Sequence, residues 1–282
     1  MALDQPLGEL YLVASSLADE LSFVALGDLS QIMSAQSDVS YRIIGGHMMT
    51  ALALRWRLGS DLYRETGDVD VGIPLLAFRN LSLESDLRGL GYVQINGSRF
   101  ERAIPELGPL LADATAPDPS SAIDILLPAY TSRPRANRRV AGHIVATEAL
   151  GLATARQRPP IAMTLRLGRL DGSEMTANLL IPDEVAALTL KALVTTVRNK
   201  DTDLVDLWRC LEICRAAGVG PEEFSTSDDL QRAADVTRRL FTDRTGPGMR
   251  AIAAYQRLSD TGGDPRHTRI QALIVRVLGR GR

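Results

Sequence analysis

Short apolar and alternating runs fill the first two thirds of the chain, and they predict strands separated by turns and short helices. The run over 121–128 is apolar except for one acid, and the run over 68–73 alternates acidic and apolar positions. A period of two places alternate side chains on opposite faces of a sheet. The predicted strands cover residues 41–44, 68–73, 92–95, 98–101, 121–128, 140–146, 161–167 and 175–181.

Helical periodicity marks the segments between and before these strands. Residues 7–37 predict one or two helices, with a break at Gly27-Asp28. Further helices are predicted over 47–59, 80–90 and 147–155.

The last third of the chain is helical almost throughout. Pro182-Asp183-Glu184 opens a strong helix, because a proline and acids in the first turn favour a helix start. We therefore expect an α/β (α+β) protein with three parts. These are a helical leader packed on the core (1–40), a mixed-sheet core (41–181) and a C-terminal helical domain (182–282).

The composition is that of an ordinary globular protein, with 45% hydrophobic residues among 282. No apolar run approaches the roughly 20 residues that cross a bilayer. No basic segment precedes an apolar core near the start of the chain. We expect a cytoplasmic protein with no membrane partner. The two cysteines, Cys210 and Cys214, lie four apart in a helical pattern without a nearby histidine, so we interpret them as helix-packing residues.

The strand over 68–73 carries two carboxylates at alternate positions. Asp68 and Asp70 point to one face, and Val69 and Val71 point to the other. Like charges side by side repel, so a cation is expected between them, and a divalent metal suits an all-oxygen site. The alternative is a solvated strand end.

A third acid lies inside an apolar strand. Asp124 interrupts the run over 121–128, where an unpaired carboxylate is costly to bury. It therefore requires a metal, a neighbouring cation or an edge position in the sheet.

A glycine pair joins the strand over 41–44 to the next helix. Gly45 and Gly46 allow a ligand to approach the backbone, and the helix start offers N–H groups to an anion. His47 follows, where a histidine can donate to a phosphate or cap the helix.

A cationic stripe is predicted on the helix that starts at Pro182. Lys191, Thr195 and Arg198 are spaced at i, i+4 and i+7, which places them on one face. Lys191 is the candidate for binding a triphosphate; the alternative is a lysine that snorkels at the core edge. Asp203 and Asp206 either orient these cations or lie exposed.

Arginine is concentrated between residues 131 and 170. The segment has a net charge of +7, since Glu148 is its single acid, against a net charge of −2 for the whole chain. Such an excess favours a polyanionic partner. The alternative is that arginine is simply the usual cation of this chain, which has two lysines among 32 basic residues. The eight arginines are Arg133, Arg135, Arg138, Arg139, Arg156, Arg158, Arg166 and Arg169.

These motifs together resemble the DNA polymerase β-like nucleotidyltransferase superfamily, in which a glycine pair precedes D-h-D (h, apolar) and a distant third acid. The match is Gly45-Gly46, then Arg64-x-Thr66-x-Asp68-x-Asp70, then Asp124. The segment LTLKALVTTVRNKDTDLVDLWRCL is more narrowly similar to the lysine helix of AbiEii/MenT-type toxins. Two features depart from the superfamily pattern: His47 follows the glycine pair, and the gap from Gly46 to Asp68 is long.

The resemblance implies a Mg²⁺-dependent nucleotidyltransferase that moves a nucleoside monophosphate from an NTP to an acceptor hydroxyl, with a two-metal site. Asp68, Asp70 and Asp124 would be the metal ligands and, with Lys191, the catalytic residues. The tRNA 3′ end is the implied acceptor, and a cognate antitoxin is the implied protein partner. The nucleotide-binding candidates are Gly45, Gly46, His47, Arg64, Thr66, Lys191 and Arg198, and the RNA-binding candidates are Arg133, Arg135, Arg138 and Arg139.

Two other functions fit the same core. An antibiotic nucleotidyltransferase of the aminoglycoside type uses the same chemistry on a cationic substrate, which the +7 segment disfavours. A non-catalytic nucleotide- or RNA-binding module is the second alternative; the presence of all three acids and Lys191 argues against it.

Overall fold

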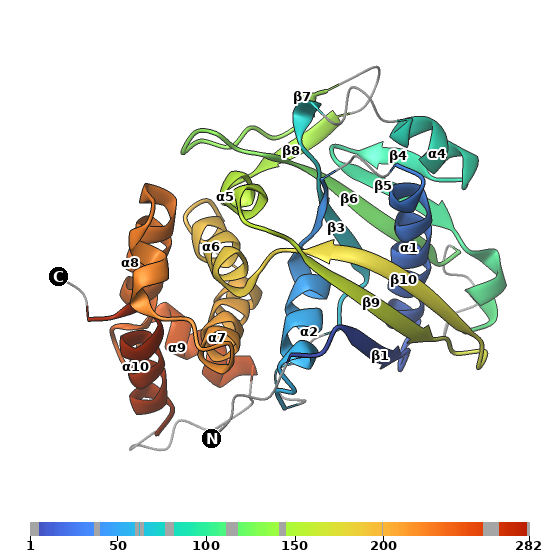
Figure 1. Ribbon diagram of the computed structural model, residues 1–282. Coiled ribbons are helices and arrows are strands. Elements are labelled where there is room, and N and C mark those ends of the chain that lie inside the picture. Colours follow the sequence, from blue (N-terminus) through green and yellow to red (C-terminus); the bar gives the residue numbers. More distant parts are fainter. Residues whose placement is uncertain are drawn as a thin grey trace.

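This computed structural model has two mixed β-sheets, a long N-terminal helix that packs against both of them, and a helical C-terminal part (Figure 1). The structure describes residues 6–36, 40–59, 62, 65–76, 82–110, 118–140, 145–198, 200–255 and 265–280. The mixed α/β class and the C-terminal helices are as predicted. The boundaries at residues 40 and 181 stay predictions. Within the described ranges, no helix has the length and apolar character to cross a bilayer.

The larger sheet is ordered β2-β3-β6-β5-β4, with β6 at its centre. Strand β6 pairs in parallel with β3 on one side and antiparallel with β5 on the other. Its C-terminal half also pairs with β8, which in turn pairs with β7. The strands are β2 (Arg42–Ile43), β3 (Asp68–Gly72), β4 (Val93–Asn96), β5 (Arg99–Ala103), β6 (Ser120–Pro128), β7 (Arg138–Arg139) and β8 (Val145–Ala149).

The smaller sheet contains β1 (Glu9–Val13), β9 (Ile161–Gly168) and β10 (Glu174–Ile181). Strand β1 runs parallel to β9, and β10 runs antiparallel to it. The helix predicted over residues 7–37 is wrong for residues 9–13, which form β1. The segment ELYLV instead follows a strand period, burying Leu10 and exposing its neighbours, and β9 supplies its hydrogen-bond partners.

Helix α1 (Leu17–Ser34) packs against strands of both sheets. The predicted break at Gly27-Asp28 does not occur. Gly27 lies within the helix, and the Met175 side chain occupies the space where a Cβ would project. Asp28 is held there because its carboxylate accepts a 2.9 Å hydrogen bond from Tyr92 and pairs with Arg102 at 3.0 Å.

The region around Thr147 differs from the prediction. Thr147 lies in β8, whereas a helix was predicted from this residue. Helix α5 (Leu152–Gln157) begins only after Gly151, whose φ of +78° turns the chain. The strand predicted over 140–146 is displaced toward β8, and residues 141–144 lie outside the described ranges.

The remaining helices are α2, which follows β2; α4, before β4; and the C-terminal set α6 to α10. Helices α6 and α7 pack against α2, whereas α8, α9 and α10 pack against α6 or α7 (Figure 1). Cys210 and Cys214 are buried in α7, consistent with helix packing. The bounds are α2 (Gly45–Arg55), α4 (Leu83–Gly89), η2 (Pro105–Leu110), α6 (Glu184–Val194), α7 (Asp201–Ala216), η3 (Pro221–Ser225), α8 (Asp228–Phe241), α9 (Pro247–Tyr255) and α10 (Pro265–Leu278).

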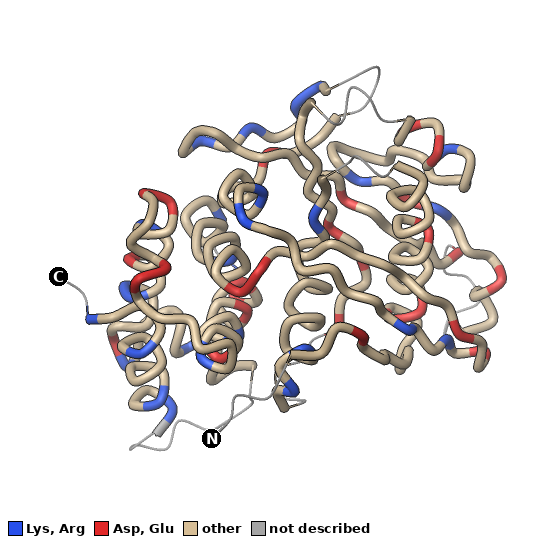
Figure 2. Tube along the Cα trace, viewed as in Figure 1, with Lys and Arg blue, Asp and Glu red and all other residues tan. Residues whose placement is uncertain are grey.

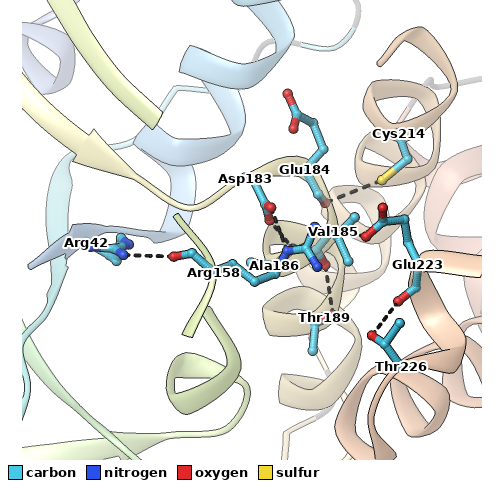
Figure 3. A network of polar contacts seen from close by, with 10 residues as sticks. All are labelled: Arg42, Arg158, Asp183, Glu184, Val185, Ala186, Thr189, Cys214, Glu223 and Thr226. Carbon is cyan, nitrogen blue, oxygen red and sulfur yellow. Dashed lines mark hydrogen bonds and ion pairs between the residues drawn. The ribbon is translucent and has the colours of Figure 1, made fainter. Parts of the chain in front are cut away.

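An arginine network ties the larger sheet to the C-terminal helices (Figure 3). The buried Arg42 of β2 donates to the Arg158 carbonyl at 3.1 Å. The Arg158 guanidinium in turn pairs with Asp183 at 2.6 Å and with Glu223 at 3.0 Å. Asp183 also caps α6 by accepting from the Ala186 N–H at 2.8 Å. Arg158 therefore links β2, through its carbonyl, to the start of α6 and η3, through its side chain.

We predict that Glu20→Gln destabilises the fold by about 3 kcal/mol, because removing one partner of a buried ion pair leaves the other charge uncompensated. Glu20 is 1% exposed and accepts from Arg169 at 2.6 Å and from the Leu170 N–H at 2.9 Å. Thermal unfolding at pH 7 measures the effect. Glu174→Gln removes the surface pair with Arg166 on the same sheet and is the matched control, expected to leave the melting temperature unchanged. Equal losses in the two variants would contradict the prediction.

Candidate active site

Parallel pairing of β3 and β6 brings the predicted acids together. Asp70 and Asp124 are direct partners in the register, and Asp68 lies two positions before Asp70 on the same face of β3. Because β6 lies between β3 and β5, an edge position no longer explains Asp124. Three carboxylates thus meet on one face of the larger sheet.

Arg99 of β5 supplies the cation that these acids require. It is the register partner of Asp124, and its Nη1 lies 3.1 Å from Asp124 Oδ2 and 3.3 Å from Asp68 Oδ2. Its Nε donates to Glu101 Oε1 at 2.6 Å. Burial lowers the pKa of Arg99, but the hydrogen bonds and charges of the neighbouring acids raise it by more, so the net shift of its pKa is upward. The sequence analysis assigned no role to Arg99.

Asp124 is partly buried, and its carboxylate accepts hydrogen bonds from Ser98 and Arg99. Burial raises its pKa and the charge of Arg99 lowers it, leaving a net rise. Ser98 Oγ donates to Asp124 Oδ1 at 3.4 Å, so both carboxylate oxygens have a neighbour on β5 or the turn before it.

The glycine turn closes directly over Asp70. Gly45 has a φ of +69°, and a Cβ there would lie 1.9 Å from Asp70 Oδ2. A Cβ on Gly46 would lie 2.5 Å from Thr66 Oγ1. Both positions therefore exclude a side chain. The turn places the N-terminus of α2, where N–H groups lack helical partners, beside the acids.

Helix α2 begins at Gly45, two residues earlier than predicted. Its N-cap is Ile44, which makes no side-chain capping bond, so His47 is not the cap and instead lies buried in the first turn. Thr66, a nucleotide-binding candidate, lies against Gly46. Arg64, the other candidate before β3, lies outside the described residues.

Lys191 is buried in the last turn of α6. Its Nζ lies 2.7 Å from Asp206 Oδ2, and only 9% of its side chain is exposed, so the snorkelling alternative is wrong. Asp206 Oδ1 accepts from Arg209 Nη1 at 2.8 Å. Asp206 thereby fixes the position of Lys191, as one of the two sequence-based alternatives proposed.

Arg198 does not share a helix face with Lys191 as predicted, because α6 ends at Val194. It lies beyond the C-terminus and makes a two-point contact with Asp203, at 2.8 Å for both Nε and Nη2. This contact raises the pKa of Arg198, and the charge of Asp70 contributes. Arg198 therefore lies within electrostatic reach of the carboxylate site.

Asp70 is the electrostatic centre of the site. Burial raises its pKa to about 6, with the charges of Asp68 and Asp124 adding to the rise. Lys191 and Arg198 lower it in part. The structure thus brings Asp68, Asp70, Asp124, Lys191 and Arg198 into one electrostatic unit beside the glycine turn.

Several arginines of the arginine-rich segment pair with acids, while others stay exposed. Arg135 and Arg138 both contact the buried Glu148, at 3.0 and 2.7 Å. Acids distant in sequence neutralise others: Arg158 pairs with Asp183 and Glu223, Arg166 with Glu174, and Arg169 with Glu20. Sequence distance hid these partners. Arg133 and Arg139 are exposed.

Comparisons with known proteins add little to this description. No family model and no curated protein matches the sequence. Among solved structures, the chain aligns with an antigenic nucleotidyltransferase-like protein from Paracoccidioides brasiliensis. The identity is 16%, the TM-score is 0.43, and the alignment covers 83% of this chain and 93% of that one. At this TM-score no residue role carries over, so the site rests on its own geometry.

We predict that Asp70→Asn stabilises the protein at pH 8 by about 1 to 3 kcal/mol, since each pKa unit corresponds to about 1.4 kcal/mol. The pKa of Asp70 is raised from 3.8 to about 6 in the fold. Its protonated form therefore favours the folded state below pH 4, and this contribution is lost as the pH rises through about 6. Denaturant unfolding from pH 4 to 8 should show the Asn variant gaining on wild type through that window. A difference that does not change with pH would contradict the assignment.

Proposed function

We propose that the protein transfers a nucleoside monophosphate from an NTP to an acceptor hydroxyl and releases pyrophosphate. The observation that carries this proposal is the juxtaposition of Asp68, Asp70 and Asp124 beneath the N-terminus of α2. Carboxylates on a sheet face beside a helix start suit a metal–triphosphate complex. The carboxylates bind the metal cation, and the N–H groups at the helix start bind the phosphate anion.

Magnesium is the metal that we assign to this site. The donors are all carboxylate oxygens, and the raised pKa of Asp70 and of Asp124 is consistent with an excess of negative charge that a cation would relieve. In the described part of the chain, no group of three or more His, Cys, Asp or Glu side chains is placed to hold a metal as the structure stands. Arg99 lies between Asp68 and Asp124. We therefore propose that Arg99 moves aside when Asp68, Asp70 and Asp124 hold Mg²⁺.

The residues of this chain then divide the work of the transfer. When bound, Mg²⁺ stabilises the negative charge on the attacking and leaving oxygens. The N–H groups at Gly45 and Gly46 bind the triphosphate, while Lys191 and Arg198 neutralise it. Asp124 accepts the proton of the acceptor hydroxyl, whose oxygen bonds to the α-phosphorus as the bond to pyrophosphate breaks. Ser98 orients the Asp124 carboxylate through its 3.4 Å hydrogen bond to Oδ1.

The acceptor that we propose is the 3′ end of tRNA, and the cellular role is that of the toxin of a toxin–antitoxin pair with a cognate antitoxin protein. The support is the AbiEii/MenT-type lysine-helix motif. Its Lys191 and Asp206 form a 2.7 Å ion pair here, and Asp203 fixes Arg198. These contacts give the motif residues a defined role in placing cations beside Asp70.

One observation favours a second candidate acceptor, a small cationic molecule of the aminoglycoside class. A cavity of about 520 Å³ lies between the segment after β6, α5 and the start of α8, and its charged lining residues are Asp228, Asp229 and Arg232. Tyr130 is 69% exposed at its rim and offers a flat apolar surface. An acidic, partly apolar cavity suits a polyamine sugar.

The deciding experiment incubates the purified protein with Mg²⁺, each labelled NTP in turn, and either total tRNA or an aminoglycoside mixture. We expect label on tRNA for wild type and none for Asp68→Asn/Asp70→Asn, which retains the shape of both side chains. Label on the aminoglycoside instead would select the second candidate. Absence of transfer to either acceptor, together with absence of NTP binding by calorimetry, would rule out both.

We predict that Arg99→Gln binds Mn²⁺ more tightly than wild type, because the guanidinium no longer competes for Asp68 and Asp124. We expect the Kd for Mn²⁺ to fall about tenfold, which corresponds to about 1.4 kcal/mol of binding free energy. Electron paramagnetic resonance of free Mn²⁺ during titration measures it without reference to activity. Arg102→Gln changes an arginine three residues further along β5 that pairs with Asp28 instead, and is the control. Weaker Mn²⁺ binding by Arg99→Gln would show that Arg99 supports the metal rather than competing with it.

A further inference from the structure

A groove rich in arginine lies on the C-terminal helices, away from the segment in which the sequence concentrates arginine. A hollow of about 380 Å³ opens between the end of α2, α7 and α10, and a second of about 410 Å³ adjoins it along α10. The two share Arg215 and Arg269. We name them together the arginine groove, whose charged residues are Arg57, Arg215, Arg266, Arg269, Arg276 and Glu212.

One buried acid, Glu212, positions two of the arginines that line the groove. Glu212 is the single acid among the described residues that line it, and its side chain is 3% exposed. Its two oxygens pair with Arg215 at 3.1 Å and with Arg269 at 2.8 Å. The side chains of these arginines are 41% and 66% exposed, so both guanidinium groups reach the protein surface. A shared internal carboxylate therefore orients two guanidinium groups for an external anion.

Helix α10 extends this charge in a line. Between residues 265 and 280 the chain carries four arginines and no acid. Arg269 and Arg276 are seven residues apart, which places them on one face about 10 Å from each other. Figure 2 shows basic residues spaced along this helix, which is labelled in Figure 1. A row of guanidinium groups matches an anion whose charges also repeat along a line.

The floor of the groove is apolar. Trp208, Ile252 and Ile270 line it, and all three are buried. Side chains that exclude water lower the local dielectric and strengthen the attraction between arginine and a phosphate. Arginine also binds phosphate oxygens by two parallel hydrogen bonds, which lysine does not.

We propose that the arginine groove binds the phosphodiester backbone of the RNA whose end reaches the candidate active site. This rests on the proposed function, which makes RNA the acceptor. Helix α2 connects the two regions: Gly45 at its start lies at the active site, and Arg57, two residues beyond its end at Arg55, lines the groove. Its eleven residues span about 16 Å, the length of about five stacked nucleotides at about 3.4 Å each.

The test compares tRNA binding by two variants that each lose three exposed positive charges. Arg57→Asn/Arg269→Gln/Arg276→Gln neutralises the groove and keeps the pair between Arg215 and Glu212; asparagine at 57 tolerates the positive φ of 51°. Arg88→Gln/Arg166→Gln/Arg239→Gln is the matched control, because these three exposed arginines lie outside the groove and are not among the RNA-binding candidates. Fluorescence anisotropy with labelled deacylated tRNA is recorded over a range of KCl concentrations, and melting temperatures and Mg²⁺–NTP binding verify that both variants are folded.

We expect the groove variant to bind tRNA about 10- to 100-fold more weakly and to lose about two units from the slope of log Kd against log salt, while the control stays within about twofold of wild type. Wild-type affinity in the groove variant would overturn the proposal, as would equal weakening in both variants. If the groove variant keeps its tRNA affinity but loses binding to poly-glutamate, an acidic protein is the ligand and the proposal is also overturned.

The failure of the groove and the failure of the proposed function are separable. Asp68→Asn/Asp70→Asn removes the proposed chemistry and leaves the groove intact, so it should bind tRNA as wild type does. Absence of nucleotide transfer with a groove-dependent tRNA affinity would refute the transferase and retain the RNA site. Transfer to tRNA that is unaffected by the groove variant at limiting tRNA would refute the groove and retain the transferase.

Discussion

A carboxylate beside two others in a partly enclosed site keeps its charge only if cations surround it, and this constraint shapes the centre of the molecule. Asp70 meets the constraint through elements that are distant in sequence. Gly45 has no side chain that would displace it, and Lys191 and Arg198 approach from the C-terminal part. The packing of the C-terminal helices against the sheet therefore also brings the cations that neutralise Asp70. In this way the architecture is coupled to the chemistry of the site.

That coupling has a second layer behind the cations. Lys191 would itself be costly to bury without Asp206, and Asp206 also holds Arg209, which is fully buried. Buried ion pairs of this kind contribute little net stability compared with apolar packing, but they fix geometry. In this protein the chain of charges from Asp70 to Arg209 sets where α6 and α7 lie relative to the acids. The position of the cations depends on the helical part being complete.

Local pattern was sufficient for several of the elements that carry the site. The strands around Asp68 and Asp124 and the helix capped by Asp183 follow from periodicity and capping, and the structure has them. The continuity of α1 at Asp28 does not follow, because Arg102 and Tyr92 override a local helix-breaking signal from across the fold. The acids and Lys191 were identified as a set from their order along the chain. Arg99 was missed, since its role depends on the pairing register of two strands, which composition does not reveal.

Charge counted along the sequence proved a poor guide to charge on the surface. The segment with the largest excess of arginine pairs its cations with Glu148 and with acids from other elements. The arginines of α10 line a groove with Glu212 as its one acid among the described residues. The arginines of residues 131–170 and those of α10 differ in how many acids from other elements lie beside them. Contacts between elements that are distant in sequence decide this.

The two cysteines make the molecule convenient for site-specific labelling. Cys210 and Cys214 are buried in α7, and burial raises the pKa of both thiols. Since the thiolate is the form that reacts with maleimides, neither native residue competes for such a reagent in the folded protein. A cysteine introduced on the surface, for example at the exposed Ser132, becomes the single reactive thiol. A fluorophore or spin label can be attached there while the native core packing around α7 stays unchanged.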